Sequence, residues 1–234
     1  VHPFWLKQHH RKPKIVCHQE LPMLNITRHA GVRLLWLTPC RSARGTANFA
    51  DRVTNEVREL FEQRGGSLYD PQVTQAEHAL QSAALAEREG AGDAVIVASL
   101  LHDVGHLLLD EHCGQTDFLA QDHDHETVGS EWLQRRFEPS LAEAVRLHVA
   151  AKRYLCATEP GYWEALSPAS KRSLELQGGV FSKEEAKLWA QQPHAEEAIN
   201  IRRWDDMAKV AGVSTPPLEH FLCKVRALVS NAQA

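Results

Sequence analysis

The sequence predicts one all-α domain that follows a basic N-terminal extension. Apolar residues recur at three- and four-residue intervals from about Asn48 onwards, which is the period of amphipathic helices. No segment between residues 45 and 230 alternates as a half-buried strand would. The length of 234 residues and the 43% hydrophobic content suit one sizeable core. We therefore expect an extension over residues 1–45 and a helical domain over 46–234.

The extension differs from the rest of the chain in charge and in pattern. Residues 1–50 carry a net charge of +7, whereas the remaining residues carry −11. Residues 1–45 contain five of the 14 histidines and show no sustained helical or strand period. We interpret them as a disordered tail, or as an extension that results from a start site assigned too far upstream. The alternative is an Arg-rich targeting segment or basic arm.

Helix signals follow one another along the domain. The first helix is expected to begin near Asn48 and to end at Gly65-Gly66, and the second should end at Gly90. Ser167, Ser182 and Thr215-Pro216 are plausible helix starts. After the first helix, the expected ranges are 73–89, 93–109, 125–137, 139–155, 168–177, 183–192, 195–210 and 217–230.

Composition also limits the partners and the compartment. An acidic body argues against nucleic acid as a partner, because phosphate backbones require clustered cations. No stretch reaches the ~18 apolar residues of a membrane-spanning helix. The cysteines are odd in number and form no CxxC pair, which indicates reduced thiols and a cytoplasmic protein. They are Cys17, Cys40, Cys113, Cys156 and Cys223.

The most informative segment is His102-Asp103, which follows the apolar run of residues 94–101. Burying these polar groups without partners would be costly, and binding a metal removes that cost. We expect the pair to lie on the third helix, with His106 on the same face one turn later. His106 could be a ligand, a donor to a ligand, or a substrate contact.

Further candidate ligands lie on four other segments. Ordinary alternatives are His78 as a hydrogen-bonded core histidine, the His125 segment as a solvated loop, and Asp205 as an acid on a helix surface. His123 and Asp206 are the neighbours from which His125 and Asp205 must be distinguished. We expect Asp206→Ala to have almost no effect on metal binding. A set with only nitrogen and oxygen donors favours iron or manganese over structural zinc. The candidates are His78, His125, His148 and Asp205.

Lys152 follows His148 by four residues, so on a helix the two side chains share a face. A lysine is normally solvated, but beside a ligand histidine it indicates an anion held against the metal.

These segments resemble the HD-domain superfamily, all-helical metalloproteins that are mostly phosphohydrolases. Within it they are similar to the organophosphonate-cleaving oxygenases, a mixed-valent diiron branch. The resemblance covers roughly residues 55–225, and the segments HVAAKRY and LQGG are its most restrictive parts. It rests on residues 74–81, 100–106, 125–129, 148–155, 166–170, 176–179 and 202–205.

The resemblance implies that His78, His102, Asp103 and Asp205 bind one iron, and that Asp103, His125 and His148 bind the other. Catalytic roles are implied for Tyr69, which can cap the iron, and for Asp103, His106 and Lys152. The residues implied to contact the substrate are His106, Lys152, Ser170, Gln177, Arg202 and Gln72. At the position of Gln72 the family has a glutamate, which contacts an ammonium group of the substrate. Tyr69 also lies one residue nearer the first histidine than in the family.

The implied function is iron- and O2-dependent cleavage of the C–P bond of a small 1-hydroxyalkylphosphonate, such as 2-amino- or 2-trimethylamino-1-hydroxyethylphosphonate. The products would be phosphate and a carboxylic acid, and the cofactors two iron ions, Fe(II) and Fe(III), with O2 as co-substrate. One alternative is a metal-dependent phosphohydrolase acting on a nucleotide or phosphomonoester. Another is a metal-stabilised binding module without turnover.

Overall fold

The computed structural model describes residues 48–109 and 124–231. Within these ranges the chain forms helices and connecting turns, with one isolated β-bridge between Leu68 and Thr74. The all-α class is confirmed, whereas the expected extension over 1–45 lies outside the described residues. The helices are α1 (Phe49–Arg64), α2 (Gln75–Arg88), α3 (Asp93–Leu100), α4 (Val104–Leu109), α5 (His125–Gln134), α6 (Pro139–Thr158), α7 (Tyr162–Ala165), α8 (Pro168–Leu176), α9 (Lys183–Trp189), α10 (Ala195–Met207) and α11 (Leu218–Asn231).

Side-chain caps explain where several helices begin. The Asn48 side chain accepts a hydrogen bond from the Asp51 N–H at the start of α1. Thr74 and Glu77 form a reciprocal capping box on α2, and Ser182 begins α9 in the same way. Ser167 caps α8, as the sequence predicted.

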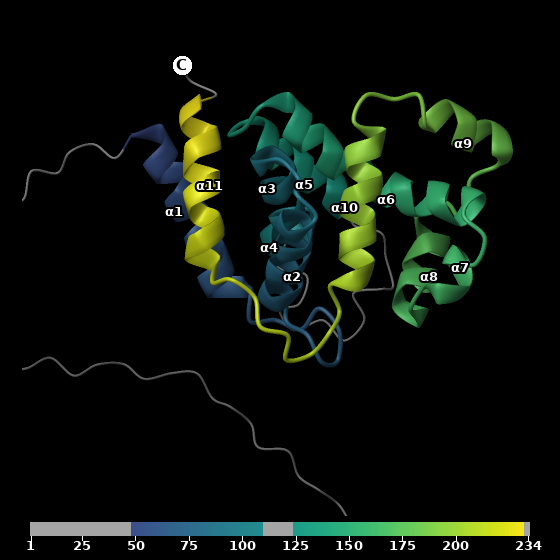
Figure 1. Cartoon of the computed structure of the whole chain (residues 1–234), viewed down its shortest axis with the longest axis horizontal. Coiled ribbons are helices and arrows are strands. Elements are labelled where there is room, and N and C mark those ends of the chain that lie inside the picture. The colour runs from purple at the N-terminus through teal and green to yellow at the C-terminus, as the bar shows by residue number, and fades with distance from the viewer. Residues whose placement is uncertain (1–47, 110–123, 232–234) are drawn as a thin grey trace, which may run out of the picture. The chain divides into compact units, whose positions relative to one another are not determined.

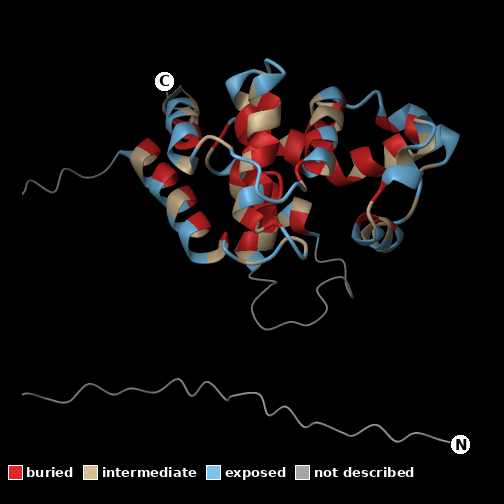
Figure 2. Ribbon diagram, turned by 60° about the horizontal axis from the view of Figure 1, so that its bottom comes forward, coloured by how far each residue is buried: buried red, intermediate tan, exposed pale blue. Residues whose placement is uncertain are grey.

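The helices pack in neighbouring groups. Helices α5 and α10 lie against α6, α2 lies against α3 and α10, and α1 pairs with α11 (Figure 1). Buried residues line the inward faces of these helices (Figure 2). The apolar core contains buried side chains from many of the helices, among them Val57, Ile96, Leu133, Val145 and Ile201. The candidate ligands thus stand on elements that the core holds together.

The single helix predicted over 93–109 was wrong. Helix α3 ends at Leu100 and α4 begins at Val104, so His102 and Asp103 lie in the turn between them. The His102 ring nitrogen Nδ1 lies 2.8 Å from the Ser99 carbonyl oxygen. An unbroken helix would offer that carbonyl to the Asp103 N–H. A side chain therefore competes with the helical hydrogen bond at the break. The short helix α7 was not predicted.

Gly105 is required by the close approach of α4 to the start of α5. A Cβ at this position would stand 1.9 Å from the His125 carbonyl oxygen. Only glycine lets the two backbones meet at this distance. The glycine thereby sets the position of His125 relative to the His102-Asp103 turn.

We expect Gly105→Ala to lower the free energy of unfolding by about 3 kcal/mol, because backbone must move to admit the methyl group. Urea denaturation measures this change. Gly66→Ala is the matched control, since a Cβ there meets no heavy atom within 4 Å. Equal stability of the two variants would contradict the packing argument.

None of the described helices combines the length and apolar character needed to cross a membrane.

Candidate metal centre

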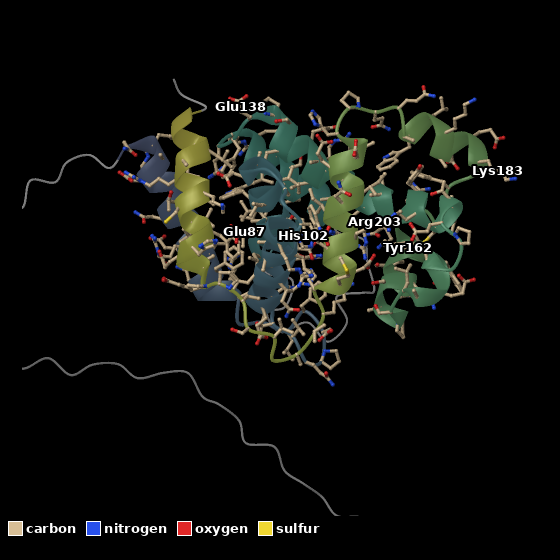
Figure 3. All side chains as sticks on the ribbon, in the orientation of Figure 1. Glu87, His102, Glu138, Tyr162, Lys183 and Arg203 are labelled. Atoms are coloured by element: carbon tan, nitrogen blue, oxygen red, sulfur yellow. The ribbon has the colours of Figure 1, made fainter. Side chains whose placement is uncertain are left out.

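Five segments bring the predicted ligands together. Helix α2 supplies His78, the turn after α3 supplies His102 and Asp103, and the first residue of α5 is His125. Helices α6 and α10 supply His148 and Asp205. All six side chains are buried, and Figure 3 shows His102 among the central helices. His123 lies outside the described residues.

Backbone carbonyls orient three of the imidazoles. Nδ1 lies 2.8 Å from the Ala208 oxygen in His78, 2.8 Å from the Ser99 oxygen in His102, and 2.7 Å from the Val145 oxygen in His148. A carbonyl oxygen only accepts, so each Nδ1 carries the proton and each Nε2 can offer a lone pair. Such bonds are the usual support of metal-binding histidines.

The Nε2 atoms gather around the Asp103 carboxylate. Its Oδ2 atom lies 3.5 Å from His78 Nε2 and 3.3 Å from His102 Nε2. Its Oδ1 atom lies 3.5 Å from the Nε2 atoms of both His125 and His148. The two oxygens of one carboxylate therefore face two different pairs of imidazoles.

Asp205 completes the first of these groups. Its Oδ1 atom lies 3.4 Å from His78 Nε2, and its side chain is 2% exposed. The Tyr69 hydroxyl donates to the same oxygen at 3.2 Å, and the Tyr69 ring stacks on His78 at 3.7 Å between centroids. Tyr69 thus reaches the cluster despite its offset of one residue along the chain.

Both carboxylates are ionised at neutral pH. Burial opposes ionisation of Asp103, but the neighbouring His102, His148 and His78 hold its pKa well below the usual range. Burial likewise opposes ionisation of Asp205, and the charges of Arg202 and Lys209 hold its pKa well below the usual range. Two buried carboxylates and four imidazoles form a donor set that suits divalent or trivalent metal ions.

His106 lies beside the second group. Its ring stacks on His125 with centroids 3.9 Å apart. Asp103, His106 and His125 each offer one ligand atom within 4.8 Å of the others, as do His78, His102 and Asp103. His106 is therefore close enough to bind a metal or a ligand on it.

A cavity of about 590 Å³ opens onto the cluster. Lys152, Ser170, Gln177 and Arg202 line it, as the resemblance implied. The buried Gln177 Oε1 atom has no hydrogen-bond partner among the described residues. The structure does not bring Gln72 to this lining: Gln72 is exposed, whereas its neighbours Asp70 and Pro71 line the cavity.

Lys152 is buried, and its Nζ atom donates a hydrogen bond to the Ser173 hydroxyl at 2.8 Å. Burial and the charge of Arg202 lower the pKa of Lys152 to about 7, although Asp205 and Asp206 oppose the shift. The lysine is therefore protonated in only part of the population at neutral pH.

Arg202 is held by two carboxylates. Its Nη1 atom lies 2.6 Å from Asp205 Oδ2, its Nε donates to Asp206 Oδ2 at 3.1 Å, and its Nη2 donates to Asp206 Oδ1. Tyr162 also donates to Asp206. Asp206 is thus a second carboxylate partner of Arg202 beside Asp205, and the expectation that its substitution leaves metal binding almost unchanged stays a prediction.

Sequence reasoning missed Lys209, which lines the cavity beside Asp205. Lys209 follows Asp205 by four residues, just as Lys152 follows His148, and the helix expected over 195–210 would have placed both side chains on one face. In the structure α10 ends at Met207, so Lys209 reaches Asp205 from beyond the helix end.

The HD domain profile matches residues 76–207, which include all six candidate ligands. The chain belongs to the HD-domain family. It is 46% identical over 182 residues to the hydroxymethylphosphonate dioxygenase of Gimesia maris, a match that covers 78% of this chain and 90% of the relative.

A second relative is the [1-hydroxy-2-(trimethylamino)ethyl]phosphonate dioxygenase (glycine-betaine-forming) of Leisingera caerulea. It is 41% identical over 181 residues, which is 76% of this chain and 91% of the relative. An uncharacterised protein of Acanthamoeba polyphaga mimivirus is 33% identical over 71% of the chain. These matches place the chain in the phosphonate dioxygenase branch of the HD-domain family. They confirm the predicted oxygenase class, and with the buried cluster they establish a metal-dependent enzyme.

Proposed function

We propose that this enzyme cleaves the C–P bond of a small 1-hydroxyalkylphosphonate with iron and O2, releasing phosphate and a carboxylic acid. The names of the two dioxygenase relatives support a hydroxyphosphonate as the substrate. The observation that carries the proposal is the junction of a buried His/Asp cluster with a cavity lined by cations.

The donor set fits a pair of iron ions. Asp103 offers one oxygen to His78 and His102, and the other to His125 and His148, so we assign it as a bridging ligand. Nitrogen and oxygen donors without thiolates suit iron. A mixed-valent Fe(II)/Fe(III) pair would supply the redox chemistry that activates O2.

The protein's own residues would bind and orient the substrate. Protonated Lys152 and the Ser170 hydroxyl bind phosphonate oxygens, and the free Gln177 Oε1 accepts from a substrate or phosphonate O–H. His106, beside the second group, contacts the same bound anion. The Tyr69 hydroxyl, bonded to Asp205, covers the first group until the substrate enters.

The lining also bears on the substituent of the substrate. Among the described lining residues Tyr69 is the one Phe, Tyr or Trp, so the cavity lacks the aromatic cage that recognises quaternary ammonium groups. Gln72 stands outside the lining and is uncharged, and the Asp70 carboxylate in the lining already accepts hydrogen bonds from the backbone N–H groups of Gln72 and Val73. We therefore propose that a primary amine is not required, and that hydroxymethylphosphonate is the first substrate to test.

The decisive assay measures phosphate release from three substrates: hydroxymethylphosphonate, 2-amino-1-hydroxyethylphosphonate and 2-trimethylamino-1-hydroxyethylphosphonate. Each is assayed with ferrous iron, once in air and once without O2. We expect release in air alone, accompanied by a carboxylic acid. Phosphate release that persists without O2, or that occurs only from phosphate esters, would favour the phosphohydrolase alternative. Stoichiometric binding without any product would favour the binding-module alternative.

We also propose that the enzyme is cytoplasmic and has no nucleic acid partner. The acidic charge of residues 51–234 and the free thiols of Cys156 and Cys223 support this.

A further inference from the structure

Helix α8 carries residues of the cavity, yet apolar packing fixes this helix only weakly. Two of its nine residues, Ser170 and Leu174, are buried, and the helix lies at the edge of the bundle (Figure 1). Gln177 caps its C-terminal end, where its backbone N–H donates to the Ser173 carbonyl. The Gln177 side chain lines the cavity, and its buried Oε1 atom has no hydrogen-bond partner among the described residues. The placement of this oxygen therefore depends on whatever holds the end of α8.

Two glycines form the turn that ends α8. The Gly179 N–H donates to the Leu174 carbonyl at 2.8 Å, which is the long-range hydrogen bond of a Schellman turn. Gly178 has a φ angle of +92° and Gly179 one of +71°, which are left-handed values that suit glycine. The carbonyl oxygens of both glycines lie beyond the helix, so they can accept hydrogen bonds from another part of the fold.

Arg153 of α6 donates to both of these carbonyls. Its Nε atom donates to the Gly179 oxygen at 2.7 Å, and its Nη2 atom donates to the Gly178 oxygen at 2.9 Å. The guanidinium carbon also lies 4.2 Å from the centroid of the Phe181 ring. A Cβ at Gly178 would stand 3.2 Å from the same carbon, so the turn and the guanidinium are in close contact. Arg153 thereby fixes the two residues that follow Gln177.

Successive residues of α6 thus hold α8 at two points. Lys152 lines the cavity and donates to the Ser173 hydroxyl at 2.8 Å, whereas Arg153 holds the turn after Gln177 and is not among the lining residues. The segments HVAAKRY and LQGG, which are separated along the chain, meet at Arg153 and the two glycines.

We propose that Arg153 is a positioning residue that keeps Gln177 Oε1 in the cavity, where this oxygen accepts a hydrogen bond from an O–H group of the bound oxyanion. The inference rests on the proposed function, because it takes Gln177 as a contact of that substrate. Arginine suits the role because its planar fork donates in two directions at once, which the single ammonium group of lysine cannot reproduce.

The test is a double-mutant cycle of Arg153→Met and Gln177→Ala in the iron-loaded enzyme. Calorimetry measures the affinity for inorganic phosphate, which carries an O–H group at neutral pH, and for hydroxymethylphosphonate without O2. We expect Arg153→Met to lower both affinities by about fivefold when Gln177 is present, and to cause no further loss in the Gln177→Ala background. Elemental analysis should show unchanged iron. Arg172→Met, which removes an exposed arginine of α8, should match the wild type.

Losses that add up in the double variant would overturn the proposal, because an effect of Arg153 on the fold alone does not require Gln177. Unchanged affinity in Arg153→Met, or in Gln177→Ala, would also overturn it. If Arg153→Met does not fold, Arg153→Lys takes its place in the cycle and is judged by the same outcomes.

The same measurements separate this proposal from the proposed function. Coupled losses of phosphate affinity in an enzyme that releases no phosphate in air would refute the proposed function alone. O2-dependent phosphate release, together with losses that add up in the double variant, would refute the role of Arg153 alone.

Discussion

Asp103→Ala is expected to lose both metal ions and all measurable turnover. The reason is geometric, because each oxygen of this carboxylate faces its own pair of imidazoles at 3.3–3.5 Å. Loss of a supporting partner of a metal ligand costs about 10–100-fold in affinity or activity, and loss of a ligand shared by two ions should cost more. Elemental analysis of the purified variant, with circular dichroism to verify folding, measures the outcome.

His148→Ala provides the comparison, since His148 Nε2 contacts only the Oδ1 side of Asp103. We expect it to weaken one metal position and to leave the other occupied. Glu175→Ala, an exposed change on α8, should retain the full metal content. Two metal ions per chain in Asp103→Ala would refute the bridging assignment, and equal losses in Asp103→Ala and His148→Ala would show that the ions bind as a unit.

Most of the fold was predictable because the chain signals its helices locally. The caps at Asn48 and Ser182 and the apolar periods locate the helices to within a few residues. The break at His102 was not predictable in the same way, since it depends on which group takes the Ser99 carbonyl. In the folded site the His102 ring takes this carbonyl, and the helix ends there although the preceding segment is strongly apolar.

The predicted ligands converge, yet their neighbours could not be ranked from sequence. Spacing alone does not show that the Arg202 guanidinium, which lines the cavity, also donates two hydrogen bonds to Asp206. Nor does it show that Gln72 turns away from the cavity while Asp70 lines it. Ligand identity follows from the donor atoms, whereas substrate contacts depend on which charges are already paired.

Lys152→Ala should leave the iron bound but lower kcat/KM by about 10²-fold, the effect of losing a charge-assisted contact of about 2–3 kcal/mol. Lys152 is buried, and its Nζ atom donates to Ser173 rather than to a carboxylate, so its charge is available to an anion. Steady-state kinetics with hydroxymethylphosphonate and elemental analysis test both halves of this expectation. Lys183→Ala, an exposed change at the start of α9, should behave as the wild type.

The charge of Lys152 also predicts how phosphonate binding depends on pH. Burial and Arg202 lower its pKa to about 7, so the ammonium is present below that pH and is lost as the pH rises. Affinity for the phosphonate should therefore fall above about pH 7, whereas Lys152→Arg, which stays charged, should show a flatter profile. Both enzymes share the ionisation of the substrate, so the difference between their profiles isolates the lysine. Identical pH profiles of KM in the two enzymes would show that the titration of Lys152 does not control binding.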